Sequence, residues 1–121
     1  MAKKKILICD DSEGVRESLK LIFEDSYELI FADDGFEAIV AAKKEAPDLV
    51  LMDIKMPGLN GIEAIKEIHK LNPKTKIICV SGYQYTESAR QALQEGAADY
   101  IVKPFEEEDI KEVVKKVLKK D

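Results

Sequence analysis

Cysteine is scarce in this chain of 121 residues, which has only Cys9 and Cys79, and His69 is its single histidine. Two cysteines make no disulfide framework, so we expect two thiols outside any disulfide and a reducing, intracellular compartment. No Cys/His pair has the spacing of zinc ligands, which argues against a soft-metal site. A chain of this length can nevertheless bury a sizeable core, and we expect one domain over residues 1–121.

Long hydrophobic runs are also missing. No apolar run approaches the roughly 18 residues that a membrane span requires. The opening MAKKKILI is basic at its start, but its apolar run stops at Cys9–Asp11. We therefore expect no secretory signal, no membrane partner and a cytoplasmic protein.

Positive charge is not in excess either. Lys and Arg total 19 against 24 Asp and Glu, for a net charge of −5. This balance argues against a nucleic-acid partner. Charged residues at 36% beside 45% hydrophobic ones are typical of a globular domain.

Five short apolar segments predict β-strands. Three of them, in 5–9, 49–52 and 76–80, are almost continuously hydrophobic, as strands buried on both faces are. This pattern favours a parallel sheet covered by helices. The predicted strands are Lys5–Cys9, Tyr27–Ala32, Leu49–Met52, Lys76–Val80 and Asp99–Val102.

Apolar stripes at helical spacing follow each predicted strand. Asn60 and Thr86 stand where the N-caps of the third and fourth helices belong, and Gly96 where the fourth ends. The stripes are Val15, Leu19, Ile22 and Phe23; Phe36, Ile39 and Val40; Ile62, Ile65, Ile68 and His69; Ala89, Ala92 and Leu93; and Ile110, Val113, Val114, Val117 and Leu118.

Each predicted strand and helix together form one βα unit, so the chain is predicted to be a (βα)5 α/β protein. Five units are too few for an eight-fold barrel, so the sheet should be open and doubly wound. Right-handed crossovers with helices on both faces require a reversal of strand order. The flavodoxin-like order 2-1-3-4-5 places this reversal between strands 1 and 3, where ligands bind beyond the carboxyl ends.

Polar residues stand at the carboxyl ends of four predicted strands. They are Asp10–Asp11, Asp53, Ser81 and Lys103. Each alone has an ordinary structural explanation, since acids often start helices and most lysines are solvated. Their joint placement at one edge of the sheet is the specific signal.

Clustered carboxylates repel one another unless a cation is present. Oxygen ligands from carboxylates and water suit Mg²⁺, which usually binds together with a phosphoryl group. With Lys103 and a metal ion to neutralise phosphoryl oxygens, Asp53 is equipped to act as a nucleophile toward phosphorus. Flavin binding, the rival use of this fold, is disfavoured because Asp10–Asp11 would repel the flavin phosphate.

Four stretches of the chain, ILICDD, LVLMDIKMPGLNG, IICVSG and GAADYIVKPF, resemble in order and spacing the signatures of the receiver domain of bacterial two-component response regulators. The resemblance covers essentially the whole chain. It implies that Asp53 is the phosphoacceptor. It also implies that Asp10, Asp11 and Asp53 hold Mg²⁺ or Mn²⁺, together with the backbone carbonyl of Lys55.

The resemblance assigns further roles to the ends of strands 4 and 5. Ser81 corresponds to the switch hydroxyl and Tyr100 to the switch aromatic, although a core aromatic is the ordinary alternative for Tyr100. Lys103 corresponds to the lysine that pairs with the phosphoryl group, and Lys103–Pro104 to a cis peptide bond.

Two positions are similar to those of the single-domain regulator of the sporulation phosphorelay: Lys55, two places after Asp53, and Tyr83, two places after Ser81. In the family these side chains border the path of the water that hydrolyses the phosphoryl group. Neither is suited to orient that water, so we expect Lys55 and Tyr83 to act as a hydrolysis gate that prolongs the phosphorylated state.

The function expected from this resemblance is a signalling module. A histidine kinase or phosphotransferase would phosphorylate Asp53, and the surface of helix 4, strand 5 and helix 5 would then change for an output protein or domain. The unphosphorylated chain is expected to be a monomer, and to catalyse only its own phosphorylation and dephosphorylation.

Two alternatives stay open. A Mg²⁺-dependent phosphatase could use Asp53 as nucleophile, although it would want an acid at the position of Lys55 to protonate the leaving group. The chain could also be the receiver part of a longer DNA-binding regulator. His69 and the lysines of the last helix are expected to be solvated.

Overall fold

A five-stranded parallel sheet forms the centre of the structure, a computed structural model that describes residues 3–54, 60–82 and 87–119. The strand order is β2-β1-β3-β4-β5, so β2 and β5 are the edges. The predicted order is confirmed; β2 begins one residue later and β4 ends one residue later than the apolar pattern indicates. The strands are β1 (Lys5–Cys9), β2 (Glu28–Ala32), β3 (Leu49–Met52), β4 (Lys76–Ser81) and β5 (Asp99–Val102).

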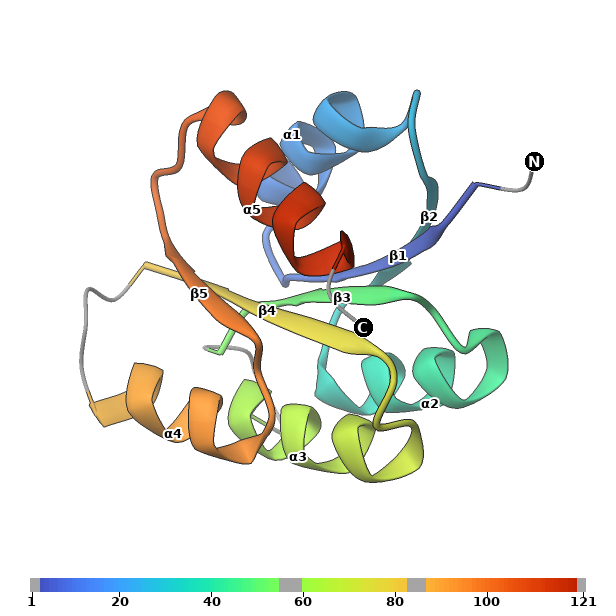
Figure 1. The fold of residues 1–121 in the computed structure, drawn as a ribbon, viewed down its shortest axis with the longest axis vertical. Coiled ribbons are helices and arrows are strands. Elements are labelled where there is room, and N and C mark those ends of the chain that lie inside the picture. Colours follow the sequence, from blue (N-terminus) through green and yellow to red (C-terminus); the bar gives the residue numbers. More distant parts are fainter. Residues whose placement is uncertain (1–2, 55–59, 83–86, 120–121) are drawn as a thin grey trace.

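Helices cover both faces of the sheet, as right-handed crossovers in a reversing strand order require. In Figure 1, α1 and α5 lie above the sheet and α2, α3 and α4 lie below it. The helices are α1 (Glu13–Phe23), α2 (Gly35–Glu45), α3 (Gly61–Leu71), α4 (Glu87–Glu95) and α5 (Glu107–Lys119).

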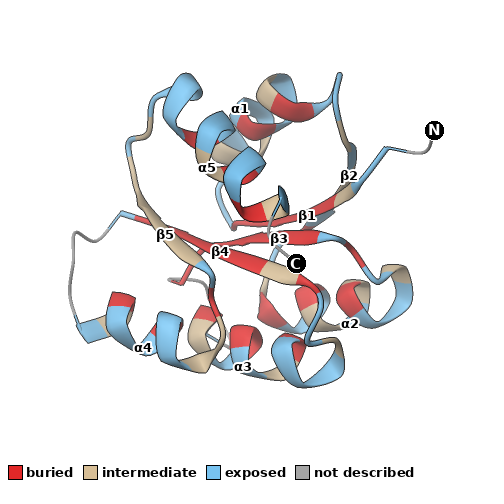
Figure 2. Cartoon of the chain, in the orientation of Figure 1, coloured by how far each residue is buried: buried red, intermediate tan, exposed pale blue. Residues whose placement is uncertain are grey.

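The core consists of two layers, one on each side of the sheet. In Figure 2 the buried residues follow the inner strands and the sides of the helices that face them. Every residue of β3 is buried, and so are four of the five residues of β1. This two-sided burial explains why these strands are continuously apolar and not alternating.

The helical stripe predicted from Phe36, Ile39 and Val40 is confirmed at Ile39, which packs against the core, and is wrong at the other two residues. The buried residues of α2 are Gly35, Ala38 and Ala42, whereas Phe36 is 60% exposed and Val40 is 65% exposed. The physical reason is close approach: small side chains let α2 lie against β1 and β2, and the larger apolar side chains are turned outward. Leu93 on α4 departs from its predicted stripe in the same way, at 44% exposed.

Two of the three residues predicted to begin or end α3 and α4 lie in the described part of the structure. The Asn60 side chain caps α3 by accepting a hydrogen bond from the Glu63 N–H at 3.0 Å. Gly96 follows α4 with φ +130°, and a Cβ there would lie 2.7 Å from Cγ of the exposed His69. A side chain is therefore excluded at Gly96 by backbone conformation and by contact. Thr86 lies outside the described residues.

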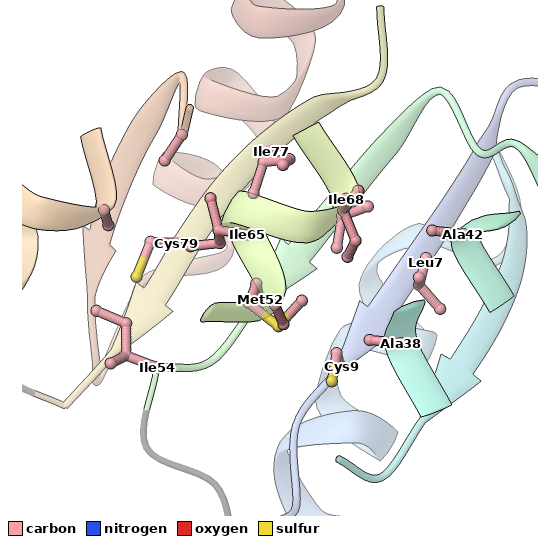
Figure 3. Packing of buried hydrophobic residues seen from close by; sticks show 14 of the residues in the cluster. Leu7, Cys9, Ala38, Ala42, Met52, Ile54, Ile65, Ile68, Ile77 and Cys79 are labelled. Atoms are coloured by element: carbon pink, nitrogen blue, oxygen red, sulfur yellow. The ribbon is translucent and has the colours of Figure 1, made fainter. Parts of the chain in front are cut away.

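Cys9 and Cys79 are buried and form no disulfide, as predicted. The register pairs Cys9 with Met52, and Met52 with Cys79, so β3 separates the two cysteine-bearing strands. Figure 3 shows the side chain of Met52 between those of Cys9 and Cys79. Within the described ranges, no helix is long and apolar enough to cross a membrane.

Candidate functional site

The acidic residues and the lysine predicted to meet at one edge of the sheet do meet. Asp10 follows β1, Asp53 follows β3, and Lys103 follows β5. The Lys103 Nζ lies 2.7 Å from Oδ2 of Asp10 and 3.2 Å from Oδ2 of Asp53. The lysine thus reaches across the end of β4 and bridges the two carboxylates.

Both bridged carboxylates are removed from solvent, with Asp10 2% exposed and Asp53 6% exposed. Buried charges of like sign are costly unless a cation compensates them. Burial lowers the pKa of Lys103, but its hydrogen bonds to Asp10 and Asp53 and their charges outweigh that effect and raise the pKa above its ordinary value. Lys103 is therefore a cation at neutral pH and supplies this compensation.

Asp11 adds a third carboxylate on the solvent side of the pair. One carboxylate oxygen from each of Asp10, Asp11 and Asp53 lies within 4.8 Å of the other two. The set offers oxygen donors only, which suits a hard divalent cation such as Mg²⁺ better than a soft metal. One half-buried lysine does not balance three carboxylates, so the geometry fits a further positive charge.

Backbone hydrogen bonds fix the two buried carboxylates relative to each other. The Asp53 N–H donates to the Cys9 carbonyl at 3.0 Å, which extends the β1–β3 pairing up to the site. The Ser12 N–H donates to Oδ1 of Asp10 at 2.9 Å, just before α1 begins. Each side chain is therefore positioned by a rigid strand end and not by a loop alone.

Ser81 and Tyr100 lie on the β4–β5 side of the site. Ser81 is the last residue of β4 and is fully buried, and its carbonyl accepts a hydrogen bond from the Lys103 N–H at 2.7 Å. Tyr100 is half-buried on β5, pairs in register with Cys79, and packs against the core layer under α3 and α4. The Lys103–Pro104 peptide bond is cis.

The structure adds a contact that the sequence did not predict. The Arg16 Nη1 donates to the Asp10 carbonyl at 2.6 Å and lies 3.4 Å from Oδ1 of Asp33. Arg16 therefore ties α1 to the ends of β1 and β2 directly behind the acidic pair. Nothing in its spacing distinguishes it from the other surface charges of α1.

Gly61 is a second residue whose role the sequence did not predict. Its N–H donates to the Ile54 carbonyl at 2.8 Å, and a Cβ at this position would lie 2.5 Å from the Ile54 Cα and closer still to the Asp53 carbonyl oxygen. Glycine is required here because the start of α3 runs directly against the backbone that carries Asp53. Lys55 and Tyr83, the expected hydrolysis gate, lie outside the described residues.

The assembled site is suited to an oxyanion. A buried carboxylate stands beside an ammonium group and beside an acidic cluster that can hold a divalent cation. Phosphoryl groups bind where cations neutralise their oxygens, and a positioned carboxylate can attack phosphorus.

The chain is similar to known proteins over nearly its whole length. The family model described as response regulator receiver domain matches residues 6–115. The chain is 43% identical over 118 residues to the chemotaxis protein CheY of Thermotoga maritima, covering 96% of this chain and 98% of that protein.

Two further matches agree with this. The chain is 35% identical over 119 residues to sporulation initiation phosphotransferase F of Bacillus subtilis, covering 98% of this chain and 96% of that protein. Among solved structures, the CheY-like response regulator receiver domain protein from Methanospirillum hungatei superimposes with a TM-score of 0.94 at 37% identity, covering 98% of this chain and 95% of that one.

Proposed function

Because this chain belongs to the response regulator receiver domain family, we propose that Asp53 is the residue through which it carries out the family's phosphoacceptor signalling role. The donor is the phosphohistidine of a histidine kinase or phosphotransferase. We assign one receiver domain to residues 1–121. The output partner is a protein or domain that binds the α4–β5–α5 surface.

The transfer uses groups that lie next to Asp53. An Asp53 carboxylate oxygen attacks the donor phosphorus, a P–O bond forms, and the P–N bond of the phosphohistidine breaks with its electron pair returning to the imidazole. Lys103 stays in place as a counter-ion to the phosphoryl oxygens. Asp10, Asp11 and Asp53, with the Lys55 carbonyl, are the proposed Mg²⁺ ligands, and the bound ion supplies charge neutralisation.

The observation that carries this proposal is the bridging ammonium group of Lys103 between Asp10 and Asp53. It marks Asp53 as a carboxylate that is buried, fixed by β3 and already paired with the cation that a phosphoryl group needs. Ser81, buried at the end of the neighbouring strand, is the proposed switch hydroxyl, and Tyr100 on β5 is the proposed switch aromatic.

Phosphorylation of Asp53 can be tested by intact-mass measurement after incubation with a small phosphodonor and Mg²⁺. The wild type should gain one phosphoryl group, and Asp53→Asn should gain none. Asp33→Asn is the matched control, because Asp33 is an acid near the site that contacts Arg16 and not Lys103. It should be phosphorylated like the wild type.

Three outcomes would count against the assignment. One is a modification that persists in Asp53→Asn, and another is a modification that resists hydroxylamine as a serine ester would. The third is multiple turnover of an added phosphoester, which would favour a phosphatase over a signalling module.

A further inference from the structure

An apolar face lies on the outer side of α2, away from the candidate phosphorylation site. Phe36 and Val40 on α2 are one helical turn apart and are 60% and 65% exposed. Together with Ile30 and Ala41 they line a groove of about 430 Å³ between the edge of the sheet and α2. We call this the β2–α2 face.

Within the described residues, no further strand pairs with the outer edge of β2. The Glu28 N–H donates to Lys4 and the Ala32 carbonyl accepts from Asp10, so alternate residues of β2 direct their backbone groups toward β1. Leu29 and Phe31 therefore direct theirs outward. The sequence ELIFA contains neither lysine nor proline, the residues that usually protect a sheet edge from pairing.

We propose that the β2–α2 face binds a second copy of this chain across a two-fold axis, with β2 antiparallel to its symmetry mate. When the pairing is centred on Ile30, Leu29 lies opposite Phe31 of the second copy. Both residues have outward backbone groups, so this register exchanges two hydrogen bonds at each of the two equivalent positions.

The same axis also brings the two α2 helices together. Measured from the end of the sheet where β2 ends and α2 begins, Ile30 lies about 7 Å from Ala32 along the strand. The midpoint between Val40 and Ala41 lies about 8 Å from Gly35 along the helix, in the same direction. Strand and helix can therefore share one axis. Because α2 packs over both β1 and β2, a strand spacing of about 4.8 Å leaves the two helices roughly 10 Å apart, an ordinary packing distance.

The charges on α2 are complementary about this axis. Glu37 lies near the amino end of the helix and Lys44 near its carboxyl end, and both line the groove. Neither forms an ion pair within the part of the chain that the structure describes. An antiparallel pair of helices centred between Val40 and Ala41 places Glu37 opposite Lys44 of the second copy, twice per dimer. This self-complementarity favours a second copy over an unrelated partner.

The dimer leaves the proposed phosphoacceptor site accessible. β2 is the sheet edge opposite to β5, so the surface of α4, β5 and α5 is not used. One strand edge and one helix face make a small interface, so we expect a weak dimer that dissociates on dilution into the monomer expected from the sequence.

The first experiment measures molar mass by sedimentation equilibrium from micromolar to near-millimolar protein. The wild type should change from monomer to dimer with concentration, and Val40→Asp should stay monomeric. Leu21→Asp is the control, since Leu21 is 72% exposed on α1 and lies outside the face. It should dimerise like the wild type.

The second experiment exchanges the charges. Glu37→Lys and Lys44→Glu should each weaken dimerisation by about tenfold, because each creates two like-charge contacts at an exposed rim. The double variant restores opposite charges and should restore the wild-type constant. Glu17→Lys on α1, which is exposed and changes the net charge as Glu37→Lys does, should have no comparable effect.

A wild type that stays monomeric throughout would overturn the proposal, and would leave the face to a strand of another protein. A dimer that resists Val40→Asp, or a double variant no better than its single parents, would also overturn it. Glu37→Lys and Lys44→Glu place charges against the dipole of α2 and should lower the melting temperature slightly, but every variant should stay folded and be phosphorylated at Asp53. A failure of this proposal is therefore separate from a failure of the proposed function.

Discussion

Asp11 differs from the other two acids of the site in its surroundings. Asp10 and Asp53 are buried and paired with Lys103, whereas Asp11 is exposed and forms no ion pair among the described residues. Its charge repels its neighbours until a divalent cation binds. As a proposed metal ligand, Asp11 would serve cation binding at the expense of stability in the cation-free protein.

Asp11→Asn should raise the free energy of unfolding without metal and remove most of the effect of Mg²⁺. In the wild type, Mg²⁺ at a hundred times its dissociation constant should stabilise the fold by about 2.7 kcal/mol. Thermal melts of both proteins with and without Mg²⁺ measure this. Asp25→Asn, an exposed acid beyond the end of α1, serves as control. Equal Mg²⁺ shifts in Asp11→Asn and the wild type would show that Asp11 is not a ligand.

Cys9 and Cys79 should resist thiol reagents in the folded protein. Cys9 is 1% exposed and Cys79 is fully buried, and burial, reinforced by the charges of nearby aspartates, raises the pKa of both thiols well above its ordinary value. The reactive thiolate is therefore scarce at neutral pH. Titration with a thiol reagent should detect neither cysteine in the native protein and both in denaturant without reductant. Rapid labelling in the native state would contradict this burial.

At the scale of the elements, the close approach between the start of α3 and the backbone of Asp53 depends on one glycine. Gly61→Ala should destabilise the protein, because the new Cβ meets backbone atoms that cannot move without displacing Asp53. Gly82→Ala is the matched control, since nothing lies within 4 Å of a Cβ there. Denaturant unfolding should show a loss of about 1–3 kcal/mol for Gly61→Ala and little change for Gly82→Ala. Equal unfolding free energies for Gly61→Ala and Gly82→Ala would contradict the need for glycine at position 61.

The sequence predicts those elements best whose burial is uniform. β1 and β3 could be placed from their continuous apolar runs because neither face of these strands is solvated. α2 could not be oriented, since a hydrophobic stripe favours its largest apolar residues whereas its fully buried residues are the small Gly35, Ala38 and Ala42. Phe36 and Val40, which the predicted stripe placed in the core, are the exposed apolar residues of the β2–α2 face.

Within the site, the residues at strand ends were predictable and their supports were not. Asp10, Asp53 and Lys103 follow from parallel topology, which brings the carboxyl ends of strands to one edge. Arg16 and Gly61 act through the backbone of Asp10 and of Ile54, and such contacts depend on how helices are placed over the sheet. No spacing rule in a single sequence reports that placement.

At the scale of the whole molecule, both faces of the sheet are covered and the two sheet edges differ in their neighbours. The proposed output partner binds the surface that includes β5, and the proposed self-association uses β2 at the opposite edge of the sheet. The three inner strands lie between them. The arrangement would allow the two surfaces to be occupied at the same time.

The contacts of Lys103 with Asp10 and Asp53 also bear on the order in which the site assembles while the chain is made. Lys103 lies 93 residues after Asp10 and 50 residues after Asp53. On the ribosome both carboxylates are made long before their counter-ion, so a nascent chain that has formed β1 and β3 carries an uncompensated acidic pair at the end of a half-built sheet. Docking of β5 beside β4 completes the sheet and brings Lys103 to both carboxylates, so the same long-range contact that finishes the sheet also supplies the cation of the site.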